Sequence, residues 1–127
     1  MDKPDDRPQD RYDIQMDVMF PKGEHMDIGA VAAGLQPWSN RTLGELNDAV
    51  VRLAVMEGDF HWHKHDLEDE FFYVLEGRLD LELEDRTVSL TPKQGFTVPR
   101  GVMHFPHARG RTVALVIEQN TVDARGD

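Results

Sequence analysis

The chain has 127 residues, no cysteine and a formal net charge of −10. This length predicts a single domain with its own core, and the absence of cysteine excludes disulfides and thiolate metal ligands. The acidic charge repels phosphate groups, so we expect no nucleic-acid partner and no membrane partner. The first residues form no apolar signal segment, which together with the missing disulfides predicts a cytoplasmic protein.

The first third of the chain shows few regular signals. Residues 1–12 are polar and contain proline, which predicts a disordered or loosely attached arm. Residues 14–44 have no clean period, and we expect a short strand or turn there, with Leu35 and Trp38 packed on the main body. A helix over residues 43–50 is an alternative prediction.

Short strands are predicted from residue 49 onward. In residues 79–84, leucine alternates with acidic residues, as in a strand with one buried face. Turn signals separate the apolar runs and no long helical period intervenes, so a sandwich or small barrel is favoured over a parallel sheet with helices. The expected strands cover residues 49–56, 59–65, 70–77, 78–85, 87–90, 95–99, 103–107 and 111–119. The domain would then span 13–120, followed by a flexible tail over 121–127.

Two of these strands have no polar face. Residues 71–75 and 112–117 are apolar at nearly every position, which is typical of strands covered on both sides. One side would face the barrel interior. The other needs a second sheet, the N-terminal segment or another subunit, and this need is the basis for predicting a homodimer.

Three of the six histidines lie at alternate positions, His61, His63 and His65. On a strand, side chains two positions apart share a face, and imidazoles at that spacing can converge on one ion. Glu70 opens the next apolar run and His104 follows a proline–glycine turn, so both can reach the same point. Three neutral imidazoles and a carboxylate suit a divalent Fe, Mn, Ni, Co, Cu or Zn ion. They also leave coordination positions open for a bidentate oxygen ligand, O2 or water.

Two sequence motifs resemble those of the cupins. Residues 63–77 resemble the first cupin motif, in which His-x-His precedes a glutamate and then a glycine, and residues 99–104 resemble the Pro-x-Gly-x-x-His core of the second. The resemblance covers roughly residues 50–119. It implies an all-β fold, the double-stranded β-helix or jelly-roll-like cupin barrel. It also implies a metal ion held inside the barrel by His63, His65, Glu70 and His104.

The resemblance leaves the function open, because cupins include both enzymes and binding modules. Our leading hypothesis is a metal-dependent enzyme of dioxygenase or isomerase type. Its substrate would be a small oxygenated or sugar-like molecule chelated at one divalent transition metal ion, with Glu70 acting as ligand or as base. The alternatives are a non-catalytic small-ligand-binding or sensory cupin, and a barrel whose metal only holds the fold.

Several other side chains are candidates for the pocket. His61 shares a face with the ligand pair and is either a fifth ligand or proton shuttle, or a hydrogen-bonded barrel histidine; we favour the second. His107 and Arg100 either lie at the pocket mouth or are exposed turn residues. The aromatic candidates, which could equally be plain core, are Phe60, Phe72, Phe96 and Phe105.

The neighbours of these candidates are expected to lie outside the site. Trp62 and Lys64 alternate with the histidines and should point away from them, toward an intersubunit face. Glu68 and Asp69 should lie in a solvated loop. The C-terminal Arg-Gly-Asp is expected to be an incidental tail.

Overall fold

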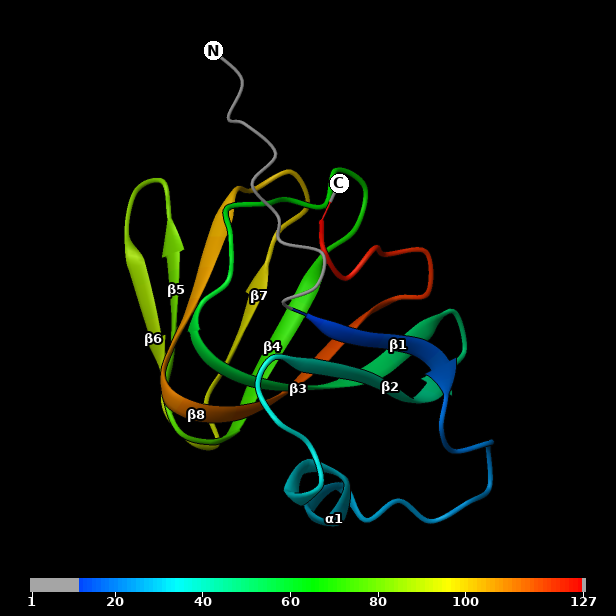
Figure 1. Cartoon of the computed structure of the whole chain (residues 1–127). Helices are drawn as coiled ribbons and strands as arrows, with labels where there is room; N and C mark the ends of the chain where they lie inside the picture. Colours follow the sequence, from blue (N-terminus) through cyan, green and yellow to red (C-terminus); the bar gives the residue numbers. More distant parts are fainter. Residues whose placement is uncertain (1–11, 127) are drawn as a thin grey trace.

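The computed structural model describes residues 12–126, so the predicted arm lies outside the described residues except for Tyr12. Figure 1 shows strands wrapped around a common interior, with one short helix outside it. The elements are β1 (Asp13–Val18), α1 (Ile28–Ala33), β2 (Ser39–Leu46), β3 (Ala49–Asp59), β4 (Glu70–Glu76), β5 (Leu79–Leu83), β6 (Thr87–Leu90), β7 (Gly95–Val98) and β8 (His104–Gln119). No helix within residues 12–126 is long and apolar enough to cross a membrane.

Strand β8 organises the sheet. It pairs antiparallel with β3 along much of its length, with β4 through residues 113–118 and with β5 through residues 104–108. The main path of the sheet runs β1-β2-β3-β8-β4-β7, and β6 joins through β5. The sequence predicted two strands over residues 103–107 and 111–119, but β8 is one continuous strand. Its backbone stays hydrogen-bonded between these two parts, since the Arg109 N–H donates to the Arg78 carbonyl (3.0 Å).

The alternating leucines of β5 face the interior as predicted. Leu79 and Leu81 are fully buried, and they pack with the apolar residues of β4 and β8, among them Phe72, Val74 and Val116. Burial of such side chains is the main stabilising contribution in a domain of this size. Several residues of this interior core also line the polar site described below.

The outer face of the sheet is covered by the N-terminal segment. Leu53, Val55 and Val113 are buried there, together with Ala32 of α1. The partly buried residues packed on this cluster are Phe20, Met26, Ile28, Val31, Leu35, Val51, Leu75 and Leu115. The N-terminal alternative therefore accounts for the apolar outer face of this part of β8, and no second subunit is needed to explain it.

The sequence missed helix α1 and proposed a helix in the wrong place. The Asp27 carboxylate caps α1 by accepting from the Ala30 N–H (3.1 Å), but six residues are too few to show a helical period. The alternative helix over 43–50 is wrong, because this segment is the β2–β3 hairpin. Its tight turn is made by Asn47 with a φ of 54°, a conformation that asparagine tolerates.

The C-terminal segment differs from the predicted flexible tail. Val122 is buried, and its carbonyl accepts from Arg52 Nη2 (3.3 Å). Just before it, the Asn120 N–H donates to the Asp48 carbonyl (2.8 Å). In Figure 1 this segment, in red, turns back from the end of β8 rather than leaving the molecule.

Candidate metal centre

The histidine segment is extended but is not the regular strand predicted over 59–65. Strand β3 ends at Asp59, and afterwards a single bridge joins His63 to His104 through backbone hydrogen bonds of 3.0 and 2.9 Å. The alternation survives without a strand, because His61, His63 and His65 are all buried. An extended backbone is therefore sufficient to place His63 and His65, the two histidines of the His-x-His pair, on one side.

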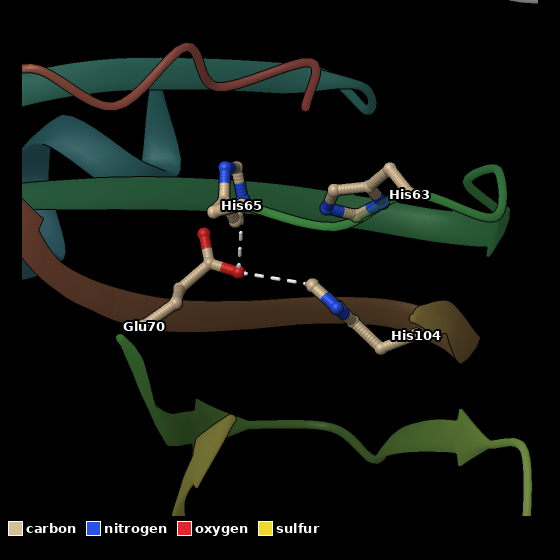
Figure 2. A group of neighbouring side chains, drawn as sticks. All are labelled: His63, His65, Glu70 and His104. Atoms are coloured by element: carbon tan, nitrogen blue, oxygen red, sulfur yellow. Dashed lines mark hydrogen bonds and ion pairs between the residues drawn. The ribbon is translucent and has the colours of Figure 1, made fainter. Parts of the chain in front are cut away.

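Four predicted residues meet inside the barrel. His63, His65, Glu70 and His104 are all buried, and each offers a ligand atom within 4.8 Å of the others. Figure 2 shows their side chains pointing toward one another from the segment between β3 and β4, the start of β4 and the start of β8. Glu70 Oε1 lies 3.1 Å from His104 Nε2 and 3.4 Å from His65 Nε2.

Backbone carbonyls set the tautomers of two of these histidines. The Nδ1 atom of His63 lies 3.0 Å from the His61 carbonyl, and the Nδ1 atom of His104 lies 3.0 Å from the Val102 carbonyl. A carbonyl only accepts, so both Nδ1 atoms donate, and in the neutral ring both Nε2 atoms then keep their lone pairs. Metal-binding histidines are commonly oriented by this kind of hydrogen bond.

This tautomer leaves His104 Nε2 and Glu70 Oε1 as two acceptors 3.1 Å apart. Buried acceptors in contact repel each other unless a proton or a cation lies between them. The donor set contains nitrogen and oxygen and no sulfur, which suits a borderline divalent ion. The group can therefore hold a metal ion, and its geometry fits one.

Burial keeps His63 in the form that a metal ligand requires. Desolvation, followed by repulsion from a proton on the neighbouring His104, lowers the pKa of His63 to about 3. The ring is therefore neutral at physiological pH, as metal ligation demands.

A second carboxyl group, not predicted from the sequence, faces Glu70. Glu118 of β8 pairs in register with Glu70, is buried and lines the same cavity. Burial, followed by the hydrogen bond and charge of Glu70, raises the pKa of Glu118 to about 10, although Arg52 (Nε 3.4 Å from Oε2) opposes this rise. The alternation of Ala114, Val116 and Glu118 was the available signal.

The two carboxyl groups consequently hold one proton and one negative charge between them. Burial acts to raise the pKa of Glu70, but its contacts with His104, His65 and the protonated Glu118 outweigh burial and hold that pKa well below its ordinary value. Glu118 keeps its proton while Glu70 is ionised, as expected when two acids share a buried site. Glu70 is thus available as an anionic ligand.

A cavity of about 50 Å³ opens beside the group. This space admits a few water molecules or a small ligand. Its lining includes Tyr12, Trp38, Phe60, His63, Glu70, Phe72, Glu118 and Ala124. Two aromatic candidates from the sequence, Phe60 and Phe72, are thus at the cavity.

Other pocket candidates lie elsewhere. Arg100 has a side chain 69% exposed, with Nε 3.8 Å from Asp69 Oδ1. His107 pairs with Asp59 through Nδ1. Phe96 packs at the edge of the interior core. None of these three candidates is part of the cavity lining.

The residues expected outside the site make local contacts of their own. The rings of Trp62 and Phe105 lie 5.5 Å apart, away from the cavity lining. Lys64 Nζ lies 2.6 Å from Asp66 Oδ1. The loop predicted to be solvated is tied back to the body, since Glu68 Oε2 accepts from Thr121 (2.7 Å).

His61 is buried and hydrogen-bonded on both sides. Its Nε2 atom lies 2.6 Å from the Arg125 carbonyl, and its Nδ1 atom lies 3.2 Å from the Tyr12 hydroxyl. His61 does not belong to the four-residue group, although its ring centroid is 5.1 Å from that of His63. Tyr12 and Arg125 were not singled out by the sequence.

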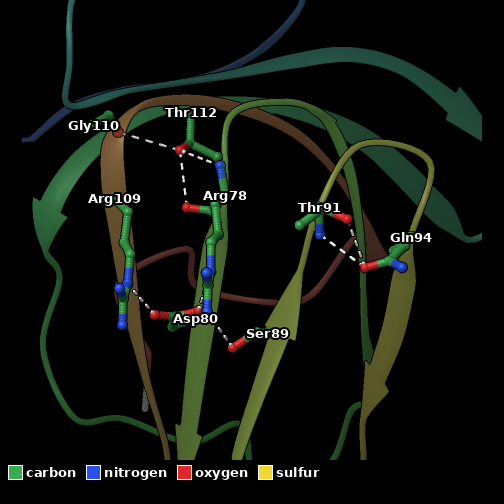
Figure 3. A network of polar contacts seen from close by, with 8 residues as sticks. All are labelled: Arg78, Asp80, Ser89, Thr91, Gln94, Arg109, Gly110 and Thr112. Atoms are coloured by element: carbon green, nitrogen blue, oxygen red, sulfur yellow. Dashed lines mark hydrogen bonds and ion pairs between the residues drawn. The ribbon is translucent and has the colours of Figure 1, made fainter.

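A second buried polar cluster lies on β5 (Figure 3). Asp80 is buried and accepts from Arg109 Nε (2.7 Å) and Arg78 Nε (3.2 Å). Burial acts to raise the pKa of Asp80, but hydrogen bonds from Ser89, Arg109 and Arg78 hold it below its ordinary value. This cluster completes its own pairing, and its residues are not part of the candidate metal group.

The structure explains why a glycine stands at position 77 in the first motif, close to this cluster. Gly77 has a φ of +84°, and a Cβ atom there would lie 2.5 Å from Thr112 Oγ1 and 2.6 Å from the Arg111 carbonyl. Any other residue would displace β8 from the turn that connects β4 to β5.

The fold and the site together define a small β-barrel protein with an internal group of three histidines and one glutamate. Residues 49–118 match the cupin domain family. The chain belongs to this family, which confirms the resemblance and the predicted cupin barrel.

The relatives support the same assignment. The uncharacterized protein YdbB of Bacillus subtilis (strain 168) is 37% identical over 86 residues, which is 67% of this chain and 76% of that protein. The crystal structure of a cupin-2 domain containing protein from Shewanella frigidimarina is 34% identical, with a TM-score of 0.68 over 72% of this chain and 89% of that one. An HTH-type transcriptional regulator, YobQ of Bacillus subtilis, is 37% identical over 59 residues, but this is only 46% of this chain and 24% of the regulator.

Proposed function

We propose that the chain is a metal-dependent cupin enzyme with dioxygenase- or isomerase-type chemistry on a small oxygenated or sugar-like molecule. One divalent transition metal ion (Fe, Mn, Ni, Co, Cu or Zn) would be held by His63, His65, Glu70 and His104. The observation that carries the proposal is the contact between His104 Nε2 and Glu70 Oε1, because the tautomer of His104 leaves both atoms as acceptors.

The chain's own residues supply the surroundings that such chemistry needs. A bound ion would act as a Lewis acid toward the oxygen atoms of a chelating ligand. His63 and His104 are held in the required tautomer by backbone carbonyls, so the site is preorganised. Phe60 and Phe72 give the cavity an apolar side, and Glu118, which also lines the cavity, keeps a proton next to Glu70.

Elemental analysis of the protein purified without added metal tests the first step. We expect close to one transition metal ion per chain in the wild type, and its loss in the His63→Ala and His104→Ala variants. His25→Ala is the matched control, because His25 is exposed and lies outside the group. Metal content unchanged in the two site variants would contradict the ligand assignment.

Activity screens test the second step. The metal-loaded protein should consume oxygen, or isomerise a substrate, with small hydroxy-carbonyl compounds and sugars, and Glu70→Gln should lose that turnover. Because Glu70 could serve as ligand or as base, metal content must be measured in the same variant. A loss of turnover with metal retained supports the base, and a loss of both supports the ligand.

A non-catalytic ligand-binding or sensory role is the second candidate. It is favoured by the similarity to YobQ, which is named as a transcriptional regulator, and by a cavity whose lining is mostly apolar. In this case small oxygenated ligands should raise the melting temperature of the metal-loaded protein without any product being formed.

We also propose a cytoplasmic homodimer. Strand β1 lies at the edge of the sheet and exposes Met16 and Val18, and an exposed edge strand is a surface on which a second chain can pair. Sedimentation equilibrium should give twice the chain mass, and a mass of one chain at all concentrations would exclude the dimer.

A further inference from the structure

We propose that Tyr12 and the C-terminal strap, residues 120–126, form the wall of the cavity that determines ligand size, and that His61 is the positioning residue that holds this wall in place. The proposal rests on the proposed function, which makes the cavity the ligand site. It assigns a role to Tyr12 and to the C-terminal residues that the sequence predicted to be a flexible tail.

The strap is in contact with the candidate metal centre. Ala124 lines the cavity together with Tyr12 and His63. Gly126 of the strap lies directly against His63, because a Cβ atom on Gly126 would lie 2.5 Å from Cβ and 2.9 Å from Cδ2 of His63. Gly126 also has a φ of +95°, so only glycine fits against the imidazole without moving the strap.

His61 joins the strap to the N-terminal side of the cavity. Its Nε2 atom donates to the Arg125 carbonyl (2.6 Å), so in the neutral ring Nδ1 is the acceptor and the Tyr12 hydroxyl donates to it (3.2 Å). Phe60 stacks on the imidazole with ring centroids 3.9 Å apart, which orients the ring. One side chain thus connects backbone and side-chain groups 64 and 49 positions away.

The first half of the strap is anchored independently of His61. Val122 is buried, and its carbonyl accepts from Arg52 Nη2. Thr121 Oγ1 donates to Glu68 Oε2. Loss of the His61 contacts should therefore free the tip, which carries Arg125 and Gly126, while the base of the strap stays in place.

The wall explains why the cavity is small. Tyr12 packs its ring against Trp38 and Phe60, with centroids 5.9 and 4.6 Å away, and the strap borders the cavity through Ala124 and His63 through Gly126. The ligand class that fits is a compact oxygen chelator with an apolar edge that faces these rings. Releasing the strap should widen the cavity without removing any candidate metal ligand.

Chelators of two sizes measure this selection. The Co(II)-loaded protein is titrated with acetohydroxamate and with the larger 2-naphthohydroxamate, and binding is followed through the visible absorption of the cobalt. We expect the wild type to favour acetohydroxamate by about tenfold or more in Kd. This preference should fall to about twofold or less in His61→Phe, which keeps the ring stacked on Phe60 but loses both hydrogen bonds.

Glycine variants give a matched pair. Gly126→Ala should also lose the preference, because its Cβ meets His63, whereas Gly110→Ala should keep it, because Gly110 has a similar φ of +74° and open space around it. Both variants place an alanine at a similar positive φ, so a difference between them reports the contact with His63. Equal preferences in the wild type, His61→Phe and Gly126→Ala would overturn the proposed wall.

Trypsin cleavage after Arg125 tests the positioning by His61 without any metal. Release of the fragment beyond Arg125 should be about tenfold faster in His61→Phe than in the wild type, and unchanged in His25→Phe. Equal rates would overturn the role of His61 whether or not the protein binds metal. Failure of the wild type to bind Co(II), with faster cleavage still seen in His61→Phe, would instead refute the proposed function and leave the positioning role of His61 intact.

Discussion

Each of the two buried polar clusters described above contains a carboxylate whose charge must be compensated, and the two clusters compensate it in different ways. Asp80 is buried, but Arg78 and Arg109 reach it and neutralise its charge. In the candidate metal centre, by contrast, Glu70 meets imidazole nitrogens, and the ring of His104 offers it a lone pair rather than a proton. Because a buried polar group is costly unless it is paired, the first cluster is complete as an element of structure, whereas the second is complete only when a proton or a cation lies between His104 and Glu70.

Removing the metal should produce the largest effect. An ion at about 100 times its Kd stabilises the folded state by about 2.7 kcal/mol, which corresponds to a melting temperature about 10 °C higher. We expect this difference between metal-loaded and chelator-treated wild type in differential scanning calorimetry. Asp80→Asn should show the same difference, and a stability that does not respond to the chelator would remove the distinction between the two clusters.

Stability of the metal-free protein should fall as the pH rises above neutrality. The pKa of Glu118 is raised from an ordinary value of 4.5 to about 10 in the folded state. The folded state therefore binds more protons, and the stability contributed by Glu118 is present in full below pH 4.5 and is lost as the pH rises toward 10. The slope is at most about 1.4 kcal/mol per pH unit.

This slope is best measured between pH 7 and pH 9 by urea unfolding. His63 has the opposite sign, because its pKa is lowered from 6.5 to about 3, but it is neutral in both states above pH 7 and does not contribute there. Glu118→Gln should flatten the curve, whereas Asp80→Asn should leave it unchanged. A slope that persists in Glu118→Gln would show that another group is responsible.

Asp80→Asn should cost less than metal removal and should act on stability alone. The variant leaves Arg78 and Arg109 without their carboxylate, but both guanidinium groups are partly exposed and can turn to water. We expect a loss of about 1–2 kcal/mol in urea unfolding, with metal content unchanged. A loss of metal in this variant would mean that the two clusters are coupled.

Arg100→Ala should have the smallest effect. The Arg100 side chain is mostly exposed, and its ion pair with Asp69 is long, at 3.8 Å. We expect a change within about 0.5 kcal/mol in stability, with metal content and hydroxamate binding as in the wild type. A tenfold loss of hydroxamate affinity would instead support the alternative in which Arg100 lies at the pocket mouth and contacts the ligand.

Local signals in the sequence were enough to find the four central side chains. The alternation of His63 and His65, the start of an apolar run at Glu70 and the turn before His104 are all readable within a few positions, and they survived even though no regular strand forms at the histidines. The prediction missed Glu118 because it lies at the end of an apolar run that reads as core.

The sequence by itself determined the all-β class, the buried faces of the strands and the set of candidate ligands, because side-chain direction in an extended chain repeats every two residues. Tertiary structure decided the rest. The pairing of Glu70 with Glu118 and the joining of Tyr12 to Arg125 through His61 depend on groups brought together from distant parts of the chain. No local pattern encodes those contacts, because their partners lie far apart in the sequence.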